Sequence, residues 1–267
     1  MNHLEVGRLW NENAAAWTAL VRAGYDTYRD ALNTPAFLAM LPDVAGLSGI
    51  DIGCGEGHNT RQLARRGARM TGIDIAETFI THAAAEEERA PLGIVYHHAS
   101  AVELPISDGV YEFATAFMSL MDIPELERVL AEVHRVLRPG GFFQFSILHP
   151  CFMTVHRRNL RGADGRTYAI EVGNYFHRTA GQVEEWLFTD APAAERQRYP
   201  KFRVPRFTRP LSEWLNHLVA AGFVIERLEE PMPDDATAAR VPSVQDAQIV
   251  AYFLHVRVRK PGVAPGR

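Results

Sequence analysis

The fold is decided by Leu47-Ser48-Gly49-Ile50-Asp51-Ile52-Gly53-Cys54-Gly55-Glu56-Gly57-His58-Asn59-Thr60. A short apolar run breaks into alternating glycines, and a helical pattern follows, so the stretch predicts a strand, a loop and a helix. Glycines at 53, 55 and 57 permit backbone torsions and a closeness of approach that a Cβ would forbid. We therefore expect the following helix to present its N-terminal amides to a nucleotide-like ligand.

The spacing of this loop narrows the kind of ligand. Asp51 ends the strand and the order is acidic-x-G-x-G-x-G, whereas a dinucleotide loop reads G-x-G-x-x-G. A second short strand, 69–74, ends in Asp74, at roughly the 20-residue distance where doubly wound folds place the acid that holds the two ribose hydroxyls. An acid at this place selects against a 2′-phosphate. A nicotinamide-dependent oxidoreductase is the weaker alternative, because the G-x-G-x-G run is followed by His58 and does not have the spacing of the dinucleotide fingerprint.

Four segments then follow one another in order: 51–57, 72–74, 104–105 and Glu132-Val133-His134-Arg135-Val136-Leu137-Arg138-Pro139-Gly140-Gly141. They resemble the ordered motifs of the class I S-adenosylmethionine-dependent methyltransferases over roughly residues 47 to 148. Outside that span the resemblance is weaker, and it is to a small-molecule subgroup of the family. It rests there on Trp10, Trp17 and Arg209-Pro210-Leu211-Ser212.

The resemblance implies an α/β fold with a Rossmann-like, doubly wound, mostly parallel seven-stranded sheet whose last strand is antiparallel. An N-terminal helical lid and an insertion after the fifth strand are added to this core. The expected units are the helical lid (1–46), the S-adenosylmethionine-binding core (47–150), the substrate-covering insertion (151–208), the C-terminal completion of the sheet (209–260) and a mobile tail (261–267).

Hydrophobic periodicity predicts the individual elements. The leader, residues 1–46, is expected to form two helical pieces interrupted at Gly24. Further helices are expected at 59–66, 76–88, 124–137 and 212–221, with Ser212 as N-cap of the last. Further strands are expected at 94–97, 110–117, 142–148, 223–228 and 249–258, with an irregular connection at 229–242. Glu86-Glu87-Glu88 is expected to be a solvated face rather than a metal site, because successive helical side chains point in different directions.

Bulk composition excludes several classes of protein. The chain has 267 residues, of which 47% are hydrophobic, and this favours one domain with a sizeable core and an insertion. Its net charge of −4 gives no global attraction to nucleic acid or to an anionic membrane. Cys54 and Cys151 are far apart, and we expect both to be reduced. With no signal-like start and no apolar run of about 18 residues, we expect a cytoplasmic protein. A monomer or a homodimer is expected.

The resemblance also implies which residues bind S-adenosylmethionine and its product, S-adenosylhomocysteine. They are Asp51, Gly53, Cys54, Gly55, Asp74, Ile75, Ser100, Ala101, Phe117 and Met118. Ser100 departs from the family, which usually has there an acid that accepts from the adenine amino group. A neutral hydroxyl weakens this contact by about 1 kcal/mol. Ser100 alternatively caps a turn, and Phe117 and Met118 alternatively belong to the core.

The acceptor side is harder to assign. His149 follows the fifth strand on the ligand side of the sheet, and an unperturbed imidazole titrates near neutrality, so it is our candidate general base. Its alternative is a neutral histidine bonded to nearby backbone. The candidates for substrate or lid contacts are Tyr25, Tyr28, Asp122, His156 and Tyr175. We expect no metal, since the adjacent His97 and His98 point to opposite faces of a strand.

The insertion mixes arginines and aromatics but also carries interleaved acids, which dilute the positive charge. A substrate-covering lid is favoured over a nucleic-acid platform, with an oligomer-forming arm as a third reading. The Asn-Pro-Pro-aromatic signature of nucleic-acid and glutamine N-methyltransferases is absent after the fourth strand. We therefore expect methyl transfer to an O or N atom of a small aromatic or heterocyclic metabolite. The alternatives are C-methylation of a small molecule and non-catalytic S-adenosylmethionine binding.

Overall fold

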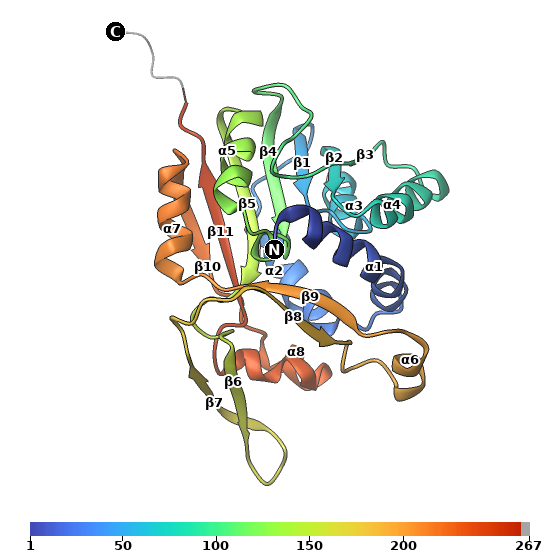
Figure 1. Cartoon of the computed structure of the whole chain (residues 1–267), viewed down its shortest axis with the longest axis vertical. Helices are drawn as coiled ribbons and strands as arrows, with labels where there is room; N and C mark the ends of the chain where they lie inside the picture. Colours follow the sequence, from blue (N-terminus) through green and yellow to red (C-terminus); the bar gives the residue numbers. More distant parts are fainter. Residues whose placement is uncertain (263–267) are drawn as a thin grey trace.

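The computed structural model describes residues 1–262, which are built around one seven-stranded sheet (Figure 1). Its strands are β1 (Ser48–Ile52), β2 (Arg69–Asp74), β3 (Val95–His98), β4 (Tyr111–Phe117), β5 (Leu137–Leu148), β10 (Val224–Glu229) and β11 (Phe253–Arg259). Their order is β10-β11-β5-β4-β1-β2-β3. Only β11 runs antiparallel to its neighbours β5 and β10 within these described strands. The predicted fold class is confirmed.

The sheet is buried on both faces, as its apolar strands require. In β5, Phe143 and Phe145 point toward α5 (Leu126–Val136) and α7 (Leu211–Ala220), where they join a large apolar cluster. Phe142 points to the opposite face and packs with residues of α3 (His58–Arg65). Burying each phenylalanine contributes about 2–3 kcal/mol. Alternating side chains of one strand thus hold helices on both sides.

A buried polar seam fixes the leader onto the sheet. The leader consists of α1 (His3–Arg22), the π-helix η1 (Arg29–Asn33) and α2 (Thr34–Met40), with the predicted break at Gly24. The Asn33 side-chain oxygen accepts hydrogen bonds from Ser146 Oγ (2.9 Å) and His255 Nε2 (2.6 Å). Gln144 Nε2 donates to the Phe37 carbonyl at 2.7 Å. These buried bonds position η1 and α2 over β5 and β11.

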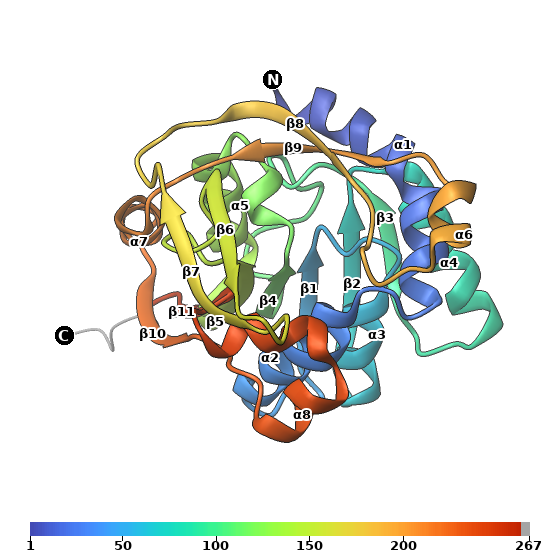
Figure 2. The same ribbon diagram turned by 90° about the horizontal axis from the view of Figure 1, so that it is seen from below.

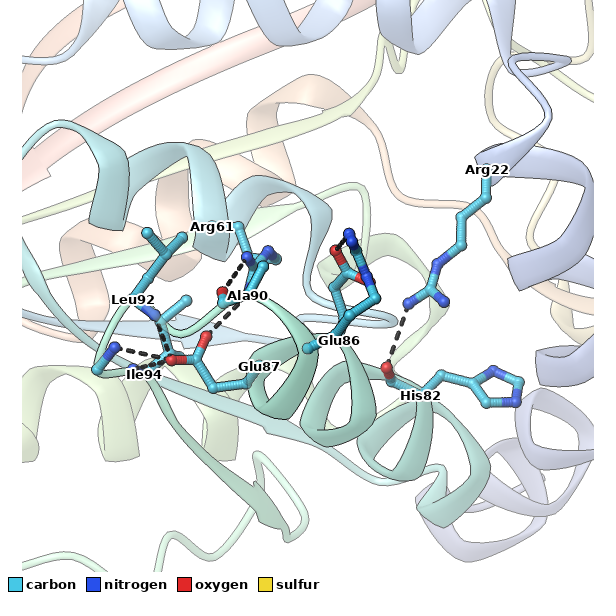
Figure 3. Close-up of polar contacts among 10 residues, drawn as sticks. Arg22, Arg61, His82, Glu86, Glu87, Ala90, Leu92 and Ile94 are labelled. Carbon is cyan, nitrogen blue, oxygen red and sulfur yellow. Dashed lines mark hydrogen bonds and ion pairs between the residues drawn. The ribbon is translucent and has the colours of Figure 1, made fainter.

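Helix α4 (Glu77–Arg89) contains the acidic triplet, and the expectation of a solvated face is wrong for its middle member. The Glu87 side chain is 15% exposed and accepts from the backbone amides of residues 92, 93 and 94 through Oε1 (Figure 3). Its Oε2 accepts from Arg61 at 2.8 Å. Glu87 therefore joins α3, α4 and the turn into β3, whereas Glu86 pairs with Arg89 on the same helix and Glu88 is exposed.

The insertion forms two antiparallel hairpins. They consist of β6 (His156–Arg161) with β7 (Thr167–Gly173), and of β8 (Ala180–Trp186) with β9 (Phe202–Phe207), α6 (Ala193–Arg198) lying between β8 and β9. Strands β8 and β9 pass beside α1 (Figure 2). The Asn13 amide donates to the Arg203 carbonyl (3.0 Å) and accepts from the Arg203 amide (2.9 Å). Trp17 packs on the same hairpin, against Trp186 and Phe202.

Three local expectations are wrong. Helix α7 begins at Leu211 with Pro210 at the cap position, so Ser212 lies inside the first turn and is not the N-cap. The connection 229–242 contains α8 (Asp235–Arg240), because the Asp234 side chain caps it by accepting from the Thr237 amide at 2.7 Å. The segment after it is the 3-10 helix η3 (Pro242–Gln248), and β11 therefore begins later than predicted.

Two further observations concern membrane-spanning helices and the C-terminal residues. In the described part, residues 1–262, there is no helix with the length and apolar character that crossing a membrane requires. Of the expected mobile tail, residues 263–267 lie outside the described residues.

Candidate active site

A cavity of about 740 Å³ opens at the carboxyl ends of β1, β2, β4 and β5. Its wall also includes residues of the leader, of both insertion hairpins and of the start of β11. This volume is within the range of small-molecule sites, and the place is where doubly wound sheets bind ligands. All ten residues predicted to bind the cofactor lie in the wall: Asp51, Gly53, Cys54, Gly55, Asp74, Ile75, Ser100, Ala101, Phe117 and Met118.

The glycine loop is tied to the end of β2. The Gly55 amide donates to Asp74 Oδ2 at 2.9 Å, and the Cys54 amide donates to the Ile73 carbonyl at 2.9 Å. Gly55 has φ +55°, and a Cβ added there would meet nothing within 4 Å among the described residues. The loop thus leaves an open space beside its backbone that suits a closely approaching ligand.

Two buried carboxylates lie at the strand ends. The oxygens of Asp51 accept from Thr60 Oγ1 (2.6 Å) and Thr115 Oγ1 (2.8 Å), which links β1 to α3 and β4. Those of Asp74 accept from the backbone amides of Gly55 (2.9 Å) and Ala76 (2.8 Å). Burial raises the pKa of Asp74 to about 6, and it also raises the pKa of Asp51. Each carboxylate has lone pairs left for ligand hydroxyls.

Two alternatives were predicted for Ser100, a contact with the cofactor and the cap of a turn. It lies in the cavity wall beside Ala101, and its Oγ also accepts from the Val102 amide at 3.4 Å, within a turn. The hydroxyl hydrogen remains available to a ligand. Ser100 therefore combines a turn contact with a position beside the cavity.

The chain turns sharply at the end of β4. Met118 has φ +55°, an uncommon conformation for a side chain with a Cβ. Its amide donates to the Ser146 carbonyl (2.9 Å), and the next residue, Ser119, donates through Oγ to the Ile52 carbonyl (2.7 Å). These contacts hold the segment after β4 against the glycine loop. Residues with strained backbone conformations are often found at functional sites.

The five nominated acceptor contacts divide into two groups. Tyr28, Asp122 and Tyr175 line the cavity, whereas Tyr25 and His156 do not. Tyr28 donates its hydroxyl hydrogen to Asp246, and the Tyr175 hydroxyl accepts from the Leu211 amide at 2.8 Å.

The other two nominations are wrong because their side chains are engaged elsewhere. Tyr25 packs in an apolar cluster with Trp17, Leu187 and Tyr199. His156 lies on the exposed hairpin and bonds to Glu171 at 2.7 Å.

The prediction that His149 acts over the cavity is also wrong. Its side chain is 2% exposed and is not part of the cavity wall. Nε2 donates to Glu230 at 2.7 Å, and Nδ1 accepts from the Cys151 amide at 3.2 Å. Burial lowers the pKa of His149. Both ring nitrogens are thus used in a structural contact, which is the alternative that the sequence left open.

The wall contains further charged side chains that the sequence did not single out for the site. They include Asp26, Arg157, Glu184, Arg206 and Arg209. Asp26 accepts from the Arg29 amide at 3.2 Å, and burial raises its pKa to about 6. Arg157 pairs with Asp246 at 2.8 Å, which also receives the Tyr28 hydroxyl. Four of the five come from the insertion or its exit, where periodicity gave no signal of side-chain direction.

Among residues 1–262, no group of three or more His, Cys, Asp or Glu side chains is arranged to hold a metal ion.

Comparisons with known proteins agree with this geometry. Residues 50–145 match the family described as "Methyltransferase domain". A crystal structure of an S-adenosylmethionine-dependent methyltransferase from Mesorhizobium loti is 30% identical, with a TM-score of 0.67, and the match covers 84% of this chain and 96% of that one.

Two curated relatives match over part of the chain. A malonyl-[acyl-carrier protein] O-methyltransferase from Pectobacterium atrosepticum is 29% identical over 142 residues, 52% of this chain and 54% of the relative. A sterol 4-C-methyltransferase from Caenorhabditis elegans is 37% identical over 98 residues, 35% of this chain and 29% of the relative. The chain thus spans about half of one relative and less of the other. Together with the glycine loop, the two strand-end carboxylates and the sheet order, the similarity to the Mesorhizobium loti protein over most of both chains shows that this chain belongs to the class I S-adenosylmethionine-dependent methyltransferase family.

Proposed function

We propose that the protein transfers a methyl group from S-adenosylmethionine to an O or N atom of a small aromatic or heterocyclic metabolite. The observation that carries the proposal is that the glycine-loop cradle and an aromatic chamber share one cavity. The aromatic residues that line this cavity include Trp10, Trp17, Tyr28, Phe79, Tyr175, Trp186, Phe188, Phe207, Trp214, Tyr252 and Phe253. Aromatic faces of this kind suit a flat ligand.

The cradle residues fit the nucleoside of the methyl donor. Asp74 has free lone pairs for a ribose diol, and Ser100 and Ala101 lie in the wall where the family binds the adenine ring. Gly55 leaves room for the amino-acid end beside its backbone. When bound, S-adenosylmethionine supplies an electrophilic methyl carbon.

The chain's own contribution to the reaction is to position the acceptor and exclude water. In-line displacement needs the acceptor atom about 3–3.5 Å from the methyl carbon, and good positioning supplies up to about 7–11 kcal/mol of the barrier reduction. Residues of the leader and of the β8–β9 hairpin contribute to the cavity wall, and by covering the bound ligands they would limit access of water to the chamber. No covalent intermediate is needed.

Two experiments test this function. Calorimetric titration with S-adenosylhomocysteine should give saturable binding, while NAD should give none. Turnover with labelled S-adenosylmethionine and a panel of phenols, heteroaromatic amines and ring lactams should give a product heavier by one CH₂. Binding without turnover on any panel member or in a metabolite extract would favour a non-catalytic binding protein.

C-methylation of a small molecule is the second candidate. It is favoured by the name of the relative from Caenorhabditis elegans, a sterol 4-C-methyltransferase. Proton and carbon NMR of the product separates the candidates, because a new methyl group on oxygen, nitrogen or carbon has a distinct chemical shift.

A further inference from the structure

One carboxylate in the cavity wall, that of Asp122, has no hydrogen-bond or ion-pair partner in the described part of the chain. Asp122 ends the short 3-10 helix η2 (Leu120–Asp122), which directly follows the strained turn after β4. It is 7% exposed and faces the cavity. Within residues 1–262 its side chain makes no hydrogen bond or ion pair, and only more distant charges act on it. A buried ionised group without a partner is costly, so its place in a ligand cavity calls for a functional reason.

The other acidic side chains of the wall are all explained by contacts within the chain. Their partners are Thr60 and Thr115 for Asp51, the Gly55 and Ala76 amides for Asp74, the Arg29 amide for Asp26, Arg22 for Glu56, and Arg206 for Glu184. Asp122 therefore stands apart from them as the acid whose hydrogen-bonding capacity is left for a ligand.

The charged neighbours of Asp122 bond to other groups, and one donor, Arg209 Nη1, is buried without a hydrogen-bond partner among residues 1–262. Arg206, on β9, donates to Glu184 and to the Met153 carbonyl. Arg209 donates to the carbonyls of residues 123 and 124 at 2.7 and 2.9 Å. Burial raises the pKa of Asp122 well above its usual range, and Arg206 and Arg209 offset this only partly, while Glu184 adds to it. The surroundings thus make the carboxylate a stronger base than a solvated one.

We infer that Asp122 accepts the proton of the methyl acceptor, and that the acceptor is an O–H or N–H compound whose hydrogen points at this carboxylate. The inference rests on the proposed function and deepens it. A lone pair of the acceptor heteroatom forms the bond to the methyl carbon. The S–C bond of the donor breaks with its electron pair going to sulfur, and the heteroatom's proton passes to Asp122, from which it is later released to water.

Turnover tests this role through Asp122→Asn, which keeps the shape and removes the base. It should lower turnover at least about 100-fold with the best O–H or N–H member of the panel, while the Kd for S-adenosylhomocysteine stays within about threefold. Asp122→Glu should retain partial turnover with a shifted pH profile. The matched control is Asp108→Asn, an exposed carboxyl before the opposite end of β4, which should behave as wild type. Asp122→Asn turnover within a few-fold of wild type would overturn the inference.

Stability of the unliganded protein provides a readout that needs no acceptor. Because the folded-state pKa of Asp122 is raised, wild type loses stability relative to Asp122→Asn as pH rises through that pKa. Urea unfolding should therefore show a more stable variant at pH 8 and a smaller difference at pH 5. Equal stabilities at both pH values would contradict an unpartnered carboxylate and sink the inference. Failure of the proposed function would show differently, as absent S-adenosylhomocysteine binding or absent turnover in wild type.

Discussion

The Asp74 side chain has two roles, because it fixes the glycine loop and also offers lone pairs to a ligand. Its two oxygens accept the amides of Gly55 and Ala76, and so they fix the glycine loop against the start of α4. The same oxygens have lone pairs directed to the cavity for a diol. A change at this residue therefore alters loop geometry and ligand contact together.

We expect Asp74→Asn to weaken S-adenosylhomocysteine binding about 30-fold, or about 2 kcal/mol, because an amide carries no charge and has only one accepting oxygen. Calorimetry measures the change. Asp108→Asn, which alters an exposed carboxyl remote from the cavity, is the control and should leave the Kd unchanged. An unaltered Kd for Asp74→Asn would rule out the assigned ribose contact.

The pH dependence of binding follows from the same residue. Burial raises the pKa of Asp74 to about 6, so its contribution to the stability of the free protein is fully present below about pH 4 and is lost as pH rises through 6. Hydrogen bonds donated by the diol favour the ionised form. S-adenosylhomocysteine affinity should therefore increase about tenfold from pH 5 to pH 7 in wild type, and much less in Asp74→Asn. A flat wild-type profile would show that Asp74 is ionised in the free protein over this range.

At the scale of elements, Glu87 connects α3, α4 and β3 (Figure 3). Its partner Arg61 is 5% exposed, so removal of the glutamate leaves a buried cation and three backbone amides without this acceptor. We expect Glu87→Ala to lower the free energy of unfolding by about 3 kcal/mol. Glu88→Ala, one residue further on the exposed side, should change it by less than about 0.5 kcal/mol. Chemical denaturation measures both free energies of unfolding, and equal losses in the two variants would contradict the structural role of Glu87.

The contact between α1 and the β8–β9 hairpin depends on Trp17. Its ring centroid is 4.8 Å from that of Phe202 and 5.0 Å from that of Phe188. We expect Trp17→Ala to cost about 3 kcal/mol in stability and to release the hairpin from the leader. Limited proteolysis should then cut faster between residues 151 and 208 than in wild type. The surface substitution Leu4→Ala, also on α1, should leave the cleavage rate unchanged.

The sequence predicted the nucleotide half well because short-range order determines it. The loop around Gly55 and the acid at Asp74 follow directly from adjacent strand ends, and all ten residues predicted to bind the cofactor lie in the wall of one cavity. The strained turn after Phe117 was not predicted. His149 was misjudged because the end of a strand fixes a position but not a direction. Its ring turns toward Glu230, which is 81 residues away in sequence. The directions of the insertion side chains could not be predicted for the same reason, because packing between distant hairpins orients them.

At the scale of the molecule, the cavity wall joins segments from nearly the whole described chain, from His3 to Phe253. A ligand that fills the cavity should therefore stabilise the leader and the insertion together. At 100 times its Kd, S-adenosylhomocysteine should add about 2.7 kcal/mol to the stability and slow cleavage within residues 151–208. Asp74→Asn at the same ligand concentration is the control and should gain less protection. Protection equal in the two proteins would place the ligand elsewhere.

The position of β11 between β5 and β10 has a consequence for biosynthesis. Strand β10 is made first, yet in the finished sheet its one neighbour is β11 among the described strands. Until β11 leaves the ribosome, β10 has no strand to pair with, and β5 remains an exposed edge strand of the sheet. Strand β11 also brings Phe253 into the wall of the cavity. A growing chain therefore has no finished cavity until β11 has left the ribosome.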